Sequence, residues 1–126
     1  MISWNSRKQP TVALSSTEAE YLAVSSASQE CIFLRGVLSD LGVVVKGATV
    51  IYEDNMGAIA LTANPVLRKR TKHIDTRHHF IRELVKDGVV KLEYLGTNEM
   101  IADVLTKNLP RPKLDDFRSN MLGIIR

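Results

Sequence analysis

The sequence predicts an α/β domain in which helices pack around a short sheet. Apolar residues recur at helical spacing over residues 16–41 and again over residues 71–86. Two short apolar stretches, residues 49–53 and 89–95, have the length and composition of strands. Helical and strand patterns therefore alternate along the chain, which is typical of α/β architecture.

Composition limits the chain to one ordinary domain, residues 1–126. Hydrophobic residues make up 44% of it and charged residues 25%. No apolar run reaches membrane-spanning length and the N-terminus lacks a signal peptide's apolar segment, so we expect an intracellular, cytoplasmic protein without a membrane partner. The net charge of +3 permits a polyanionic partner. Cys31 is the single cysteine, which excludes an intrachain disulfide, and is expected to be a buried apolar residue.

The N-terminal residues 2–14 are expected to form a strand. Both ends of this stretch are apolar and extended in character, while Pro10 cannot donate a hydrogen bond to a neighbouring strand. The strand should therefore lie at a sheet edge or carry a bulge. Because Met1 stands directly before it, we expect an upstream segment to be missing.

The later elements follow from periodicity and from glycines that end helices. The strand over residues 49–53 is almost continuously apolar, which is typical of a strand covered on both faces. The strand over residues 89–95 alternates apolar and charged residues from Val90 onward, as expected for one wetter face. The expected elements are helix 16–41 ending at Gly42, strand 49–53, helix 57–61, helix 71–86 ending at Gly88, strand 89–95, a helix over 100–105 and helix 113–122.

The first helix begins with two acids that call for different explanations. Ser15 and Glu18 fit a capping box, in which the serine caps the helix and Glu18 reaches back to a free amide. This explains Glu18 without any catalysis. Glu20 lies beside the apolar stripe of the helix and is left unexplained.

Two further acids occupy positions that suit a metal centre. Asp54 follows an apolar strand, at the edge where open α/β sheets place ligands, although Asp54 or Asn55 could equally cap the next helix. Asp103 lies early in a late helix. Together with Glu20, they are three acids from separate elements, which is what a magnesium site for phosphoryl chemistry requires.

Basic residues gather just before and within the helix over residues 71–86. One interpretation is that these residues form a solvated face. The other is that they contact a nucleic-acid backbone, and we favour this second interpretation in combination with the carboxylates. The histidines of this region lack the spacing of a zinc site, and no role follows for them. The basic residues are Arg68, Lys69, Arg70 and Lys72, and the histidines are His73, His78 and His79.

Short motifs along the chain provide a more specific signal. They are ISW at 2–4, TVALSSTEAEY at 11–21, YEDN at 52–55, KHID at 72–75, HFIRE at 79–83, MIAD at 100–103 and LPRP at 109–112. Together they resemble the C-terminal ribonuclease H domain of copia-type LTR retrotransposon Pol polyproteins. The resemblance covers essentially the whole chain.

This resemblance implies a ribonuclease H-like fold, with a mixed sheet flanked by helices and without the family's first two strands. It implies that Glu20, Asp54 and Asp103 are catalytic and hold two Mg²⁺ or Mn²⁺ ions about 3.5–4 Å apart. The implied substrate is the RNA strand of an RNA–DNA hybrid, which its 2′-hydroxyl groups distinguish from DNA. The implied partner is a reverse transcriptase segment upstream in the same polyprotein.

The chain departs from the family at one metal ligand. The family's first strand carries another metal-binding aspartate, whereas no acidic residue precedes Glu18 here. We therefore expect the chain to be inactive alone. Because the family's first two strands are missing, we also expect unpaired strand edges and an uncovered helix face. The alternatives are a non-catalytic nucleic-acid-binding remnant and a polyprotein segment without independent function.

Overall fold

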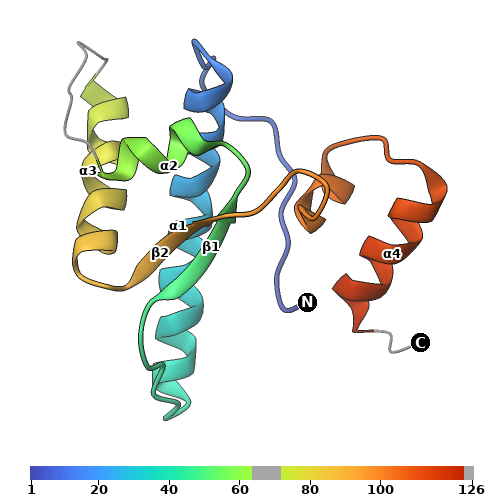
Figure 1. Cartoon of the computed structure of the whole chain (residues 1–126). Helices are drawn as coiled ribbons and strands as arrows, with labels where there is room; N and C mark the ends of the chain where they lie inside the picture. The colour runs from blue at the N-terminus through green and yellow to red at the C-terminus, as the bar shows by residue number, and fades with distance from the viewer. Residues whose placement is uncertain (64–71, 124–126) are drawn as a thin grey trace.

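The computed structural model describes residues 1–63 and 72–123, and Figure 1 shows their arrangement. Every helix and strand expected after residue 15 is present, although the late helix is a short 3₁₀ helix. The elements are α1 (Ser16–Asp40), β1 (Thr49–Glu53), α2 (Met56–Ala63), α3 (Lys72–Lys86), β2 (Val90–Tyr94), the 3₁₀ helix η1 (Ile101–Leu105) and α4 (Arg111–Leu122).

The sheet consists of β1 and β2, which pair in parallel with Thr49 opposite Val90 and Glu53 opposite Tyr94. A parallel pair requires a crossover connection, which α2 and α3 provide. The two strands consequently end at the same edge of the sheet. The α/β class is as expected, but the mixed sheet is not found in the described part of the chain, where the sheet is purely parallel.

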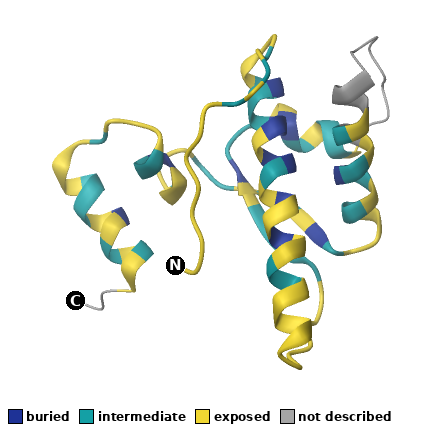
Figure 2. Ribbon diagram, turned by 180° about the vertical axis from the view of Figure 1, so that it is seen from behind, coloured by how far each residue is buried: buried dark blue, intermediate teal, exposed yellow. Residues whose placement is uncertain are grey.

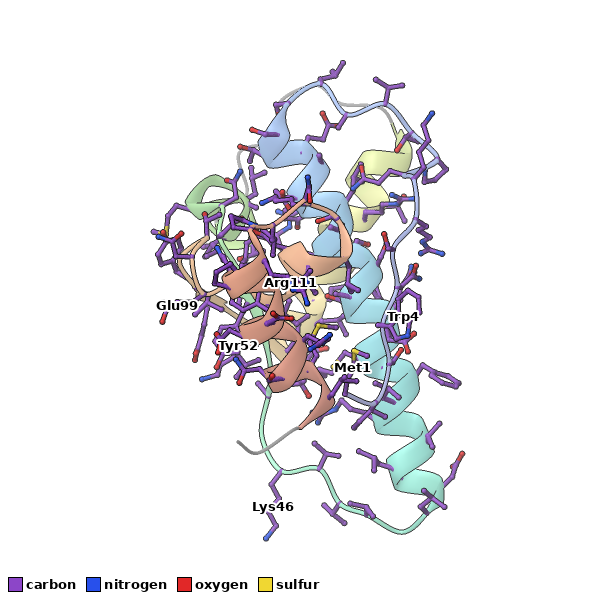
Figure 3. The ribbon with its side chains drawn as sticks, turned by 90° about the vertical axis from the view of Figure 1, so that its right-hand side faces the viewer. Met1, Trp4, Lys46, Tyr52, Glu99 and Arg111 are labelled. Atoms are coloured by element: carbon purple, nitrogen blue, oxygen red, sulfur yellow. The ribbon has the colours of Figure 1, made fainter. Side chains whose placement is uncertain are left out.

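The predicted N-terminal strand is wrong. Residues 1–14 contain no strand, and they run alongside α1 between the core and α4 (Figures 1 and 3, with Met1 and Trp4 labelled in Figure 3). Single hydrogen bonds hold this segment, from Ser6 to the Leu105 carbonyl and from Gln9 to the Ala19 carbonyl. A strand requires ladder hydrogen bonds to a neighbouring strand, and residues 1–14 make none, because in the described part of the chain β1 and β2 pair only with each other.

The hydrophobic core lies where α1 packs on α2 and α3. Its buried centre is formed by Tyr21, Val24, Ala58 and Ile81. The partly buried residues packed around this centre are Leu61, Phe80, Val85 and Leu92. The prediction that β1 is covered on both faces is wrong, because Tyr52, its fourth residue, is 53% exposed.

Glycines end the two long helices as expected. Gly42 follows α1 with φ near +76°, and its amide donates to the Ser39 carbonyl at 2.9 Å. Gly88 follows α3 with φ near +67°, and its amide donates to the Val85 carbonyl at 3.1 Å. The expectation that Cys31 is buried is also confirmed.

The two halves of α1 differ in burial, as the colours of Figure 2 show. The buried residues, from Glu18 to Cys31, lie in the first half and just past its end. The second half and the loop after it expose apolar side chains, so the uncovered helix face expected from the sequence is present. These side chains belong to Ile32, Phe33, Val37, Leu38, Leu41, Val43 and Val44.

Candidate metal centre

The start of α1 is fixed by local hydrogen bonds that leave Glu20 available. The Ser15 hydroxyl accepts a hydrogen bond from the Glu18 amide at 3.1 Å, and the Glu18 carboxylate accepts one from the Leu14 amide at 2.8 Å. The capping role predicted for Glu18 is confirmed, and its buried carboxylate is committed to the helix start. Glu20, in the next turn, is the acid that α1 directs toward the end of β1.

The end of β1 carries two adjacent acids, Glu53 and Asp54. The cap of α2 is supplied by Asn55, whose side-chain oxygen accepts a hydrogen bond from the Ala58 amide at 3.1 Å. Of the two residues that could cap this helix, Asn55 is therefore the cap and Asp54 is not. Its carboxylate instead accepts a hydrogen bond from the Thr97 hydroxyl at 2.8 Å. This hydrogen bond links the segments that follow β1 and β2.

Three acids meet at this edge of the sheet. Glu20, Glu53 and Asp54 each place a carboxylate oxygen within 4.8 Å of the other two. Glu53 is only 5% exposed, and one of its oxygens accepts a hydrogen bond from the Asn55 amide at 2.9 Å. We refer to these three residues as the carboxylate cluster.

Glu53 was not expected from the sequence to belong to a site. Side chains alternate between the faces of a strand, so Glu53 shares the face of Ile51 and lies opposite the exposed Tyr52. An acid on the inward face at the end of a strand was therefore a signal available in the sequence.

Asp103 lies next to the carboxylate cluster but is not one of its three mutually close members. It is 7% exposed in η1, and its Oδ1 lies 2.8 Å from Nζ of Lys107, four residues later. Its charge contributes to raising the pKa of Glu20, so the two acids interact electrostatically. The structure thus brings all three predicted acids, Glu20, Asp54 and Asp103, to one region. Lys107 was missed, although its spacing from Asp103 is that of a helical ion pair.

The electrostatics of the region favour a bound cation. Burial raises the pKa of Glu20, the charge of Asp54 raises it further, and the ammonium group of Lys107 opposes both. Burial also raises the pKa of Glu53 to about 7, opposed by the hydrogen bond from the Asn55 amide and reinforced by the charges of Glu20 and Asp54. Buried, mutually repelling carboxylates gain most when a positive ion neutralises them.

The donor set also suits a hard divalent ion. Magnesium takes oxygen ligands at about 2.0–2.1 Å, so two ligands on opposite sides of one ion lie roughly 4 Å apart. The oxygens of the carboxylate cluster all lie within 4.8 Å of one another, so a small inward movement at most would bring them to one ion. The residues therefore fit the metal that the sequence implies.

Comparison with known proteins gives a consistent result along nearly the whole chain. Over 125 residues, 99% of this chain, it is 43% identical to the "Retrovirus-related Pol polyprotein from transposon RE2" of Arabidopsis thaliana. The polyprotein from transposon RE1 of the same plant is likewise 43% identical over 125 residues. The polyprotein from transposon TNT 1-94 of Nicotiana tabacum is 47% identical over 114 residues.

This chain is similar to a segment of transposon Pol polyproteins. It spans 8% of the length of each of these relatives. No family model and no solved structure matches the chain. The similarity to Pol polyproteins agrees with the retrotransposon origin expected from the motifs.

The predicted nucleic-acid contacts stay predictions. Arg68, Lys69 and Arg70 lie outside the described residues, as does the side chain of Lys72. The side chains of His73 and His78 are likewise not described, and His79 is exposed on α3. Within residues 1–63 and 72–123, no helix is both long and apolar enough to cross a membrane.

Proposed function

We propose that this chain is the ribonuclease H segment of a retrotransposon Pol polyprotein. Its reaction is the metal-dependent hydrolysis of the RNA strand in an RNA–DNA hybrid. The observation that carries the proposal is the convergence of Glu20, Glu53 and Asp54 within 4.8 Å at the end of β1, with Asp103 beside them. The similarity to transposon Pol polyproteins supports it independently.

Each acid has a distinct structural role in this proposal. Glu20 and Asp54 present oxygens from α1 and the end of β1, and Glu53 adds a buried oxygen behind them. The Thr97 hydroxyl donates to one oxygen of Asp54 and so restricts the rotation of that carboxylate. Asp103 completes the set from η1. When bound, Mg²⁺ or Mn²⁺ ions supply the positive charge that activates an attacking water and stabilises the leaving 3′ oxygen.

The proposed hybrid substrate is the one that the family resemblance implies, and the charge of the chain supports it. An RNA–DNA hybrid is a polyanion, and the chain carries a net charge of +3 despite its acidic centre. The basic residues Arg68, Lys69, Arg70 and Lys72 are proposed to bind its phosphates. The 2′-hydroxyl is the group by which the RNA strand is distinguished from DNA.

The test is cleavage of an end-labelled RNA–DNA hybrid in the presence of Mg²⁺ or Mn²⁺. The 126-residue chain is assayed beside the same chain joined to the polyprotein sequence that flanks the matched segment in its relatives. We expect cleavage of the RNA strand by the joined chain, and little or none by the 126 residues alone. Asp54→Asn should abolish cleavage, because it removes a charged ligand while preserving the shape of the side chain.

The matched control is Asp87→Asn, which makes the same chemical change at an exposed position after α3. It should leave cleavage unchanged. Hybrid binding that survives Asp54→Asn, without cleavage by any version of the chain, would contradict the proposal and favour a nucleic-acid-binding remnant. Equal cleavage of an all-DNA duplex would contradict the proposed substrate.

A further inference from the structure

The ammonium group of Lys107 lies where the acids of the candidate metal centre meet. Its Nζ is 2.8 Å from Oδ1 of Asp103. Its charge acts on Glu20, and it experiences the charges of both Asp54 and Glu20. Acids from α1, from the end of β1 and from η1 therefore face the same positive charge.

The two members of this ion pair differ in their freedom to move. The Asp103 side chain is 9% exposed, whereas the Lys107 side chain is 52% exposed. The backbone of Lys107 is fixed, since its amide donates to the Asp103 carbonyl at 2.8 Å. The long aliphatic stem of lysine lets the ammonium group move into solvent while its Cα stays in place. The carboxylate has no comparable route out of the site.

We propose that Lys107 is a tethered cation that occupies part of the metal centre beside Asp103 and is displaced when a divalent ion binds. This inference rests on the proposed function, because it concerns the metal that the same carboxylates are proposed to hold. In the metal-free chain the ammonium group offsets the repulsion among Glu20, Asp54 and Asp103. A divalent ion offsets that repulsion more strongly and repels the ammonium group.

Lys107 is therefore a positioning residue that sets the affinity of the centre for metal. The ion must replace an existing favourable pair at Asp103, so the lysine lowers the apparent affinity. Removing the lysine charge should have the opposite effect. An arginine at the same position keeps the charge and should preserve the competition.

The first test measures Mn²⁺ binding by the 126-residue chain, using the electron paramagnetic resonance signal of free Mn²⁺. Lys107→Gln should bind Mn²⁺ up to roughly fivefold more tightly, the factor that corresponds to a partly exposed ion pair. Lys107→Arg should bind like the unmodified chain. The matched control is Lys91→Gln, because Lys91 also pairs with an acid, Glu93, and its loss changes the net charge equally.

The second test uses the unmodified chain and does not depend on any variant folding. Lysines are acylated with a limiting amount of an amine-reactive ester, and the modification of each lysine is followed by mass spectrometry. An ammonium group bound to carboxylates reacts slowly. Adding Mg²⁺ should therefore increase the modification of Lys107 several-fold relative to Lys91, whose side chain is also 52% exposed and paired with an acid.

Three outcomes would overturn these proposals in distinguishable ways. Unchanged or weaker Mn²⁺ binding by Lys107→Gln would overturn the displacement alone, and so would a Lys107 reactivity that does not respond to Mg²⁺. Absence of Mn²⁺ binding by the unmodified chain and by every variant would overturn the proposed metal centre, and the displacement with it.

Discussion

The two halves of α1 carry similar apolar side chains in opposite surroundings. In the first half, Tyr21 and Val24 are buried against α2 and α3. In the second half, which is largely yellow in Figure 2, Phe33 is 64% exposed and Val37 is exposed as well. The helical period is continuous through both halves, so the period alone does not determine which residues are covered.

The candidate metal centre lies entirely on the packed side of this comparison. Glu20 belongs to the first half of α1, and Glu53 and Asp54 lie at the end of β1, a strand that α1 contacts. Carboxylates that share an ion must be held within a fraction of an ångström, which requires packed neighbours on every element that carries them. Packing and chemistry therefore occur together in this chain, and the second half of α1 carries none of the acids of the candidate centre.

The comparison predicts its largest effect in the core. Ile81→Ala should reduce the free energy of unfolding by about 2–5 kcal/mol, because Ile81 is fully buried and the truncation leaves a cavity. Phe33→Ala removes a larger side chain from the exposed half of α1 and should change the free energy of unfolding by less than about 0.5 kcal/mol. Urea denaturation followed by circular dichroism measures both. Similar losses for the two variants would show that the second half of α1 is covered in solution.

The stability of the packed region should also depend on pH, because burial of Glu53 raises the pKa of its carboxyl group from the ordinary value of 4.5 to about 7. A raised pKa means that the folded chain binds the proton more tightly than the unfolded chain does. The stabilisation is therefore complete below the unfolded pKa and is lost as the pH rises through about 7. We expect the free energy of unfolding of the metal-free chain to fall by about 2 kcal/mol between about pH 5.5 and about pH 8.

Glu53→Gln should remove most of this dependence of stability on pH. Thermal unfolding of the variant and of the unmodified chain at the two pH values measures the difference. The part that remains belongs to Glu20, whose pKa is raised by burial and by the charge of Asp54. Saturating Mg²⁺ should have a similar flattening effect on the unmodified chain, since an ion stabilises the ionised carboxylates. A Glu53→Gln variant with unchanged pH dependence would contradict the burial of this carboxylate.

Two glycines offer the smallest and most closely matched test. A Cβ at Gly57 would lie 3.0 Å from Oδ1 of Asn55 and 3.1 Å from the Thr17 side chain, so Gly57→Ala must displace the cap of α2 or its contact with α1. We expect a loss of about 1–2 kcal/mol. Gly36 lies in the second half of α1 with nothing within 4 Å of such a Cβ. Gly36→Ala should therefore stabilise the chain by about 0.5–1 kcal/mol.

Equal effects of the two glycine substitutions would contradict the difference in packing between the two halves of α1. A loss at Gly36 in particular would mean that another surface lies against the second half of α1. Thermal unfolding of both variants in one buffer is sufficient, because each adds a single methyl group. A gain at Gly57 would contradict the close approach of α2 to α1.

The sequence was sufficient for the elements that depend on local signals. Ser15, Gly42 and Gly88 fixed helix ends correctly because capping and left-handed glycines act through the nearest few residues. Residues 2–14 were predicted wrongly, because a strand depends on a neighbour that extended character does not supply. The exposure of Tyr52 was missed for the same reason, since the cover of a strand comes from distant segments.

The candidate site shows the same division between local and distant signals. Glu20, Asp54 and Asp103 could be chosen by their positions at the ends of elements and by the resemblance of their motifs. Glu53 and Lys107 offer only weak signals in the sequence, and the fold shows which acids they lie beside. Nothing in the spacing of these two residues fixes which distant side chains they face.

The parallel pairing of β1 and β2 also sets the order in which this chain can be completed during synthesis. Thr49 pairs with Val90, so β1 lacks its strand partner until the polypeptide beyond α3 has left the ribosome. Glu20 and Asp54 emerge early, whereas Asp103 and Lys107 are among the later residues to appear. A nascent chain therefore has no complete site for a divalent ion, and ion capture becomes coupled to the last steps of folding.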